Sequence, residues 1–181
     1  MLLESKVALV TGAGQGVGQG IALALAAEGA ALAVSGRTLE KQELTCALLR
    51  ERGDDALPVV CDVISADSLR SLVDQVIARF VRLDILVNNA QEVPLGTLEQ
   101  VSDDSFTAGW ESGPLATFRL MKLCRPHLKG GGCIVNLASS AARRWAACGP
   151  SLSKHAMPMV MSCNRPAAFR RGPTANPRSA A

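Results

Sequence analysis

The residues best suited to do chemistry lie in a glycine-rich segment near the start of the chain, TGAGQGVG, from Thr11 to Gly18. Gly12, Gly16 and Gly18 follow a G-x-x-x-G-x-G spacing between an apolar run and a helical pattern. Such glycines permit a tight turn, let the backbone approach a pyrophosphate and allow a helix to pack closely on a strand. Backbone N–H groups at the helix start then face the phosphate charge. The segment predicts dinucleotide binding; the alternative is a glycine-rich turn without a ligand.

The end of the second apolar run indicates which dinucleotide is preferred. A carboxylate about 20 residues past the turn would bind the ribose 2′-OH and select NAD. The sequence here is VSGRT, with Gly36 at that place and Arg37 after it. No acid is present there to repel a 2′-phosphate, and a guanidinium can pair with one. We therefore expect NADP(H) to be preferred over NAD(H); the alternative is that Arg37 is a solvated loop residue.

Short apolar runs and helical patterns alternate along most of the chain. Runs without polar alternation are typical of a parallel sheet with helices on both faces, and the alternation implies right-handed crossovers. The predicted fold class is a doubly wound, Rossmann-like α/β sheet. Ser102, followed by two acids, is expected to cap a helix. We expect strands at 7–10, 31–35, 58–61, 85–88 and 134–137, and helices at 17–28, 39–52, 66–80 and 102–123.

Composition and charge fit one globular domain with a distinct tail. The chain has 181 residues, of which 48% are hydrophobic, enough for one buried core. Its formal net charge of +3 comes from the tail, where four arginines and no acid follow residue 164, so nucleic-acid binding is not expected. Residues 1–163 are expected to form one NADP-binding, Rossmann-like domain. Residues 164–181, rich in arginine and proline, are expected to be disordered.

The cysteines and histidines do not suggest a metal site. Six cysteines form no C-x-x-C pair, and the two histidines lie at no ligand spacing from them. No signal-peptide pattern and no apolar stretch of membrane-spanning length is visible. We expect a cytoplasmic protein with reduced thiols that neither binds a metal nor inserts into a membrane.

Four segments occur in the order and spacing of short-chain dehydrogenases/reductases, which the chain resembles over about residues 5 to 156. They are TGAGQGVG, CDV at 61–63, LDILVNNA at 83–90 and GGGCIVNLASS at 130–140. The resemblance implies hydride transfer between a nicotinamide cofactor and a small carbonyl or alcohol. It implies that Asp62 contacts the adenine and that Asn88, Asn89 and Ala90 end the fourth strand beneath the cofactor. The implied cofactor residues are Gly12, Gln15, Gly16, Val17, Gly18, Arg37, Asp62, Val63, Asn89, Ala90 and Lys154.

The same resemblance implies a catalytic set that is incomplete in this chain. Ser139 would hydrogen-bond the substrate oxygen, and Lys154 would hold the nicotinamide ribose and lower the pKa of a neighbouring tyrosine. That tyrosine belongs four residues before Lys154, where Pro150 stands, and the chain contains no tyrosine. The position of the assisting asparagine falls on Gly113. A further departure is Gln91, which replaces the usual glycine after NNA.

These departures predict impaired catalysis. A positioned acid or base contributes typically 10²–10⁴-fold to a rate, and proline has no proton to give. The alternative is a non-catalytic NADP(H)-binding or interaction protein, paired with another copy or an intact relative through the helices after strands four and five. The family's last strands are not recognisable, so we expect a C-terminally truncated or degenerate member. An exposed edge at 133–137 would then favour association.

Overall fold

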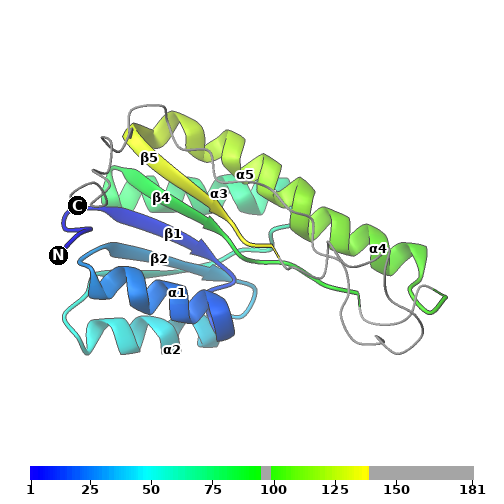
Figure 1. Cartoon of the computed structure of the whole chain (residues 1–181), viewed down its shortest axis with the longest axis horizontal. Helices are drawn as coiled ribbons and strands as arrows, with labels where there is room; N and C mark the ends of the chain where they lie inside the picture. The colour runs from blue at the N-terminus through cyan, green and yellow to red at the C-terminus, as the bar shows by residue number, and fades with distance from the viewer. Residues whose placement is uncertain (95–98, 139–181) are drawn as a thin grey trace, which may run out of the picture.

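The computed structural model describes residues 1–94 and 99–138, which form a five-stranded parallel sheet with helices on both faces (Figure 1). The strand order is β3-β2-β1-β4-β5, and every neighbouring pair is parallel. The predicted doubly wound, Rossmann-like sheet is therefore confirmed. The strands are β1 (Val7–Thr11), β2 (Ala31–Gly36), β3 (Ala56–Val60), β4 (Leu83–Asn88) and β5 (Leu128–Asn136).

Two helical layers enclose the sheet. Helices α1 (Gly16–Ala27) and α2 (Leu39–Arg50) cover one face, and α3 (Ala66–Phe80) and α5 (Ala116–Cys124) cover the other (Figure 1). Each layer has its own buried cluster, because successive side chains of a strand point to opposite faces. On β1, Ala8 and Val10 pack under α1 and α2, whereas Val7 and Leu9 pack under α3 and α5. This double burial explains why the strands are apolar without alternation.

One predicted helix, at 102–123, is interrupted. The structure has α4 (Asp103–Trp110), a π-helical turn (Glu111–Leu115) and then α5, with Pro114 inside the turn. Proline has no N–H to donate and its ring clashes with the carbonyl four residues earlier, and a π-helical turn is a local widening of the helix. The predicted cap is confirmed, since the Ser102 hydroxyl accepts a hydrogen bond from the Ser105 N–H at 3.2 Å.

A buried carboxylate joins the starts of two central strands. Asp84 of β4 accepts hydrogen bonds from the Val7 N–H at 3.0 Å and from Arg82 at 2.8 and 2.6 Å, and Lys6 lies 3.5 Å away. Burial raises the pKa of this carboxyl group, but the bonds from Arg82 and Val7 outweigh burial and hold the pKa below its ordinary value of 3.8. The ionised form of Asp84 therefore stabilises the fold.

Replacing Asp84 by asparagine is expected to lower the free energy of unfolding at pH 7 by about 2 kcal/mol. Because the folded-state pKa is depressed, the contribution of Asp84 is present above the unfolded-state pKa and is lost as the pH falls through the folded-state value. Urea unfolding at pH 7 and below pH 4 measures both effects. Asp74→Asn is the control, because Asp74 is exposed on α3 and makes no hydrogen bond or ion pair with described residues. Equal unfolding energies for the two variants at pH 7 would contradict this role.

Within residues 1–94 and 99–138, no helix is long and apolar enough to cross a membrane. In the same part of the chain, no cluster of three or more histidine, cysteine or acidic side chains could hold a metal ion.

Candidate functional site

The glycine-rich turn forms a cradle between β1 and α1. Gly12 and Gly16 adopt φ angles of +65° and +59°, in the left-handed region that favours glycine. A Cβ at Gly18 would lie 2.4 Å from the Gly12 carbonyl oxygen, so α1 packs directly on the turn. A Cβ at Gly16, in contrast, would meet no atom within 4 Å. The turn is closed on its inner side and open at Gly16, which is the shape a bound pyrophosphate requires.

The first turn of α1 has the features of an anion-binding site. Its N-cap, Gln15, makes no side-chain capping bond, and the first turn contains no acid. The positive end of the helix dipole therefore has no acid in its first turn and no side-chain cap against it. Lys41 of α2 adds a cation that the sequence patterns did not identify, and its Nζ donates to Gln15 Oε1 at 2.8 Å. Val17 is exposed beside this opening.

Thr11 fixes the end of β4 against the turn. Its buried Oγ1 accepts hydrogen bonds from the N–H groups of Asn89 and Ala90, both at 3.0 Å, and donates to the Val87 carbonyl at 3.4 Å. The Asn89 side chain donates to the carbonyl oxygens of Thr11 and Gly12 at 2.9 and 3.2 Å. Asn89 and Ala90, which follow β4, thus hold the end of that strand against the glycine turn.

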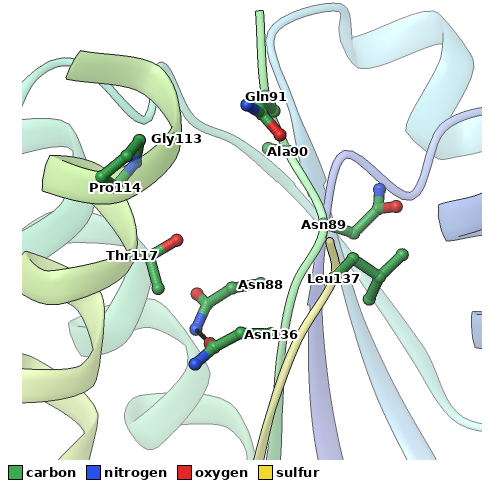
Figure 2. A pocket seen from close by; sticks show the side chains of 9 residues that line it. All are labelled: Asn88, Asn89, Ala90, Gln91, Gly113, Pro114, Thr117, Asn136 and Leu137. Carbon is green, nitrogen blue, oxygen red and sulfur yellow. Dashed lines mark hydrogen bonds between the residues drawn. The ribbon is translucent and has the colours of Figure 1, made fainter. Parts of the chain in front are cut away.

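A second hollow lies on the other side of β4, lined by polar groups of β4, β5 and the π-helical turn (Figure 2). Its free volume is only about 20 Å³, room for about one water molecule. The Asn88 amide donates to Asn136 Oδ1 at 2.7 Å and so joins the ends of β4 and β5. Asn88 and Asn89 point to opposite sides of the strand, because neighbouring side chains alternate. Asn136 was not identified from the sequence.

Two departures from the family pattern meet in this hollow. Gly113 lies in the π-helical turn and faces the side chain of Gln91, which follows β4 (Figure 2). A Cβ at Gly113 would lie 3.1 Å from Gln91 Nε2 and 3.4 Å from Gln91 Cγ. An asparagine at position 113 would therefore require Gln91 to move. The structure pairs the two unusual residues, although they are 22 positions apart.

Of the other predicted cofactor residues, Arg37, Asp62 and Val63 lie in the described part of the chain, at the same edge of the sheet, where the parallel strands end. Arg37 follows β2, and Asp62 and Val63 follow β3. Asp62 is exposed, and its Oδ1 accepts a hydrogen bond from the Ile64 N–H at 3.1 Å. Arg37 is not merely solvated, because its guanidinium lies 3.6 Å from the carboxylate of Glu92. No acid stands at the end of β2, as the sequence shows, but Glu92, four residues beyond the end of β4, lies near Arg37 in the fold.

The structure does not describe the predicted catalytic residues. Ser139 and Lys154, with Pro150 and the expected tail at 164–181, lie outside the described residues. The structure therefore brings together the predicted cofactor residues from Gly12 to Ala90, and it does not test the catalytic set.

Comparison with known proteins identifies the family. A sequence model of the short chain dehydrogenase family matches residues 6–170. The chain belongs to the short chain dehydrogenase family. One relative of this short chain dehydrogenase is a 12alpha-hydroxysteroid dehydrogenase from a Clostridium species, 40% identical over 149 residues that cover 77% of this chain and 58% of that protein. The chain spans little more than half the length of the curated relatives it matches.

Solved structures of the family agree with the fold. A short chain dehydrogenase from Burkholderia cenocepacia in complex with NADP is 34% identical, with a TM-score of 0.78 over 83% of this chain and 62% of that one. An NAD⁺-bound xylitol dehydrogenase is 33% identical, with a TM-score of 0.76 over 80% of this chain and 57% of that one. Relatives of this short chain dehydrogenase thus bind nicotinamide dinucleotides of both kinds.

Proposed function

We propose that this short chain dehydrogenase binds NADP(H) in preference to NAD(H) through its first 163 residues. The cradle at Gly16 carries the proposal: it has open space, a left-handed backbone and an uncapped helix start in one place. In this proposal the pyrophosphate lies against Gly12–Gly18, Asp62 contacts the adenine, and Arg37 pairs with the 2′-phosphate. Bound nicotinamide would supply hydride chemistry, and the chain's own residues would orient it.

Replacing Arg37 by alanine is expected to weaken NADPH binding about tenfold and to leave NADH binding within about twofold, because a charge-assisted bond to the 2′-phosphate is lost. Fluorescence titration with both dinucleotides measures the two dissociation constants. Arg70→Ala is the matched control, since Arg70 is an exposed arginine paired with Asp67 on α3, far from the cradle in the fold. An unchanged ratio of NADPH to NADH affinity in Arg37→Ala would refute the proposed preference.

As a further part of the proposal, hydride transfer to small carbonyl compounds or from alcohols is slow or absent. Ser139 and Lys154 are retained, but Pro150 stands where the acid/base tyrosine belongs and Gly113 where the assisting asparagine belongs. Loss of a positioned acid/base is worth 10²–10⁴-fold in rate. A screen of NADPH oxidation against a panel of ketones and aldehydes tests this, and robust turnover of any member would overturn it.

A non-catalytic NADP(H)-binding or interaction protein is the second candidate. It is favoured by the missing tyrosine and by β5, which is an edge strand among the described residues. Association through β5, or through α4 and α5, would cover that edge. Saturable NADPH binding without turnover would support this candidate over an enzyme. A stable monomer in size-exclusion chromatography would count against the association.

We also propose a cytoplasmic location, supported by the state of the buried thiols. Cys46, Cys61 and Cys124 are buried and form no disulfide. Burial raises the pKa of the Cys46 thiol to about 11 and that of Cys124 to about 12, which leaves both protonated and unreactive at neutral pH. Unpaired buried cysteines of this kind are typical of a reducing compartment.

A further inference from the structure

The ion pair between Arg37 and Glu92 lies where the proposed 2′-phosphate would bind. The guanidinium NH1 and the carboxylate Oε2 are 3.6 Å apart, and the two side chains are 69% and 50% exposed. Arg37 directly follows β2, whereas Glu92 lies four residues beyond the end of β4. The pair is accessible to a ligand on the solvent side. Exposed ion pairs of this kind are weak, so an incoming anion can replace the carboxylate as the partner of Arg37.

The backbone at Glu92 is held in place by the helix on the other side. The Glu92 N–H donates to Ser112 Oγ at 2.9 Å, and Ser112 is only 4% exposed. Gly109 of α4 packs on the next peptide group, since a Cβ there would lie 3.3 Å from the Glu92 carbonyl oxygen. The contacts from α4 and the π-helical turn fix the position from which the Glu92 side chain reaches Arg37. Glu92 is thus a positioned acid at the mouth of the cradle.

We infer that Glu92 is a cofactor-selectivity residue, whose carboxylate holds Arg37 and reduces the advantage of NADP(H) over NAD(H). This inference rests on the proposed role of Arg37. A 2′-phosphate carries between one and two negative charges near neutral pH, so it must displace the carboxylate from Arg37 and then lie close to it. A ribose 2′-OH carries no charge, so NAD(H) has no need to displace the carboxylate from Arg37. The same carboxylate therefore opposes one cofactor and tolerates the other.

Glu92→Gln separates these effects, because it removes the charge and keeps the side-chain length. We expect the variant to bind NADPH and 2′,5′-ADP about three- to tenfold more tightly than the parent chain. Binding of NADH and 5′-ADP is expected to stay within twofold. The two adenosine probes report on the 2′-phosphate site without any contribution from the nicotinamide half. Isothermal titration calorimetry on the full chain measures all four dissociation constants.

Glu43→Gln is the matched control, since Glu43 is 48% exposed and pairs with Arg50 at 3.4 Å on α2. It is expected to bind all four ligands as the parent chain does. If Arg37→Ala weakens NADPH binding but Glu92→Gln behaves like Glu43→Gln, the inference is wrong and the proposed function stands. If Arg37→Ala leaves NADPH binding unchanged, the assignment of Arg37 to the 2′-phosphate is wrong, and the inference about Glu92 falls with it.

Discussion

Replacing Gly18 by alanine is expected to abolish measurable NADPH binding and to lower the free energy of unfolding by about 3 kcal/mol. The new Cβ would lie 2.4 Å from the Gly12 carbonyl oxygen and 2.5 Å from Asn89 Nδ2. Both atoms are fixed, the first in the turn and the second by its bond to the Thr11 carbonyl. The helix must therefore move away from the turn, and the N–H groups at its start move with it. Urea unfolding and NADPH titration measure the two losses.

Gly20→Ala is the matched control for this result. Gly20 lies on the same helix, two residues further on, and a Cβ there would meet no atom within 4 Å. Alanine in a helix interior is about 0.5–1 kcal/mol more favourable than glycine, so this variant should be more stable and should bind NADPH normally. Loss of binding in both variants, or in neither, would contradict the close packing of α1 on the turn as the basis of the site.

Replacing Thr11 by valine is expected to cost about 2–3 kcal/mol of folding stability and to weaken NADPH binding at least tenfold. Valine has nearly the same shape but cannot accept the hydrogen bonds from the N–H groups of Asn89 and Ala90. Each donor left without a partner costs about 1–3 kcal/mol when it is buried, and these two are partly exposed. The segment that follows β4 is then no longer held against the glycine turn by these two hydrogen bonds.

Thr11→Ser keeps the hydroxyl and tests whether the hydrogen bonds or the packing matter. It is expected to lose less than about 1.5 kcal/mol, the usual cost of one deleted core methyl group, and to bind NADPH within about threefold of the parent chain. Thermal unfolding with and without NADPH measures both variants. Equal effects in Thr11→Val and Thr11→Ser would show that the hydroxyl of Thr11 does not organise the cradle.

The layered fold could be predicted from the sequence because each element carried a local signal. The runs at 7–10, 31–35 and 85–88 all fall within observed strands, and the helix at 66–80 matches α3. The strand expected at 58–61 begins earlier, at Ala56, and Pro58 is accommodated because β3 is an edge strand of the described sheet. A strand that is buried on both faces consists almost entirely of apolar residues, and such a run can be recognised in one sequence without comparison to others.

The interruption of the helix at 102–123 could not be foreseen in the same way. Pro114 lies inside this segment, and the helix continues past it through a π-helical turn, a local widening that accommodates the proline. The early start of β5, at Leu128, was missed for a different reason. The glycines at 130–132 have no side chains from which an apolar pattern could be read, although they lie within β5, between the residues that pair with Leu83 and Ile85 of β4.

The site residues were predictable only where they lie within a motif. Gly12, Gly18 and Asn89 were named from the sequence, and they lie in close contact in the structure. Glu92 was missed because nothing in its local sequence indicates that it faces Arg37, 55 positions away. Lys41 was missed for the same reason, since its bond to Gln15 depends on how α2 packs beside the turn. Both contacts join polar side chains that are far apart in the sequence, and only the folded arrangement shows them.

The central claim, that the cradle at Gly16 binds NADP(H), is tested most directly by fluorescence titration of the full chain with NADPH and NADH under identical salt. We predict saturable binding of both, with a lower dissociation constant for NADPH. Absence of saturable NADPH binding by a folded chain, or tighter binding of NADH, would contradict the account.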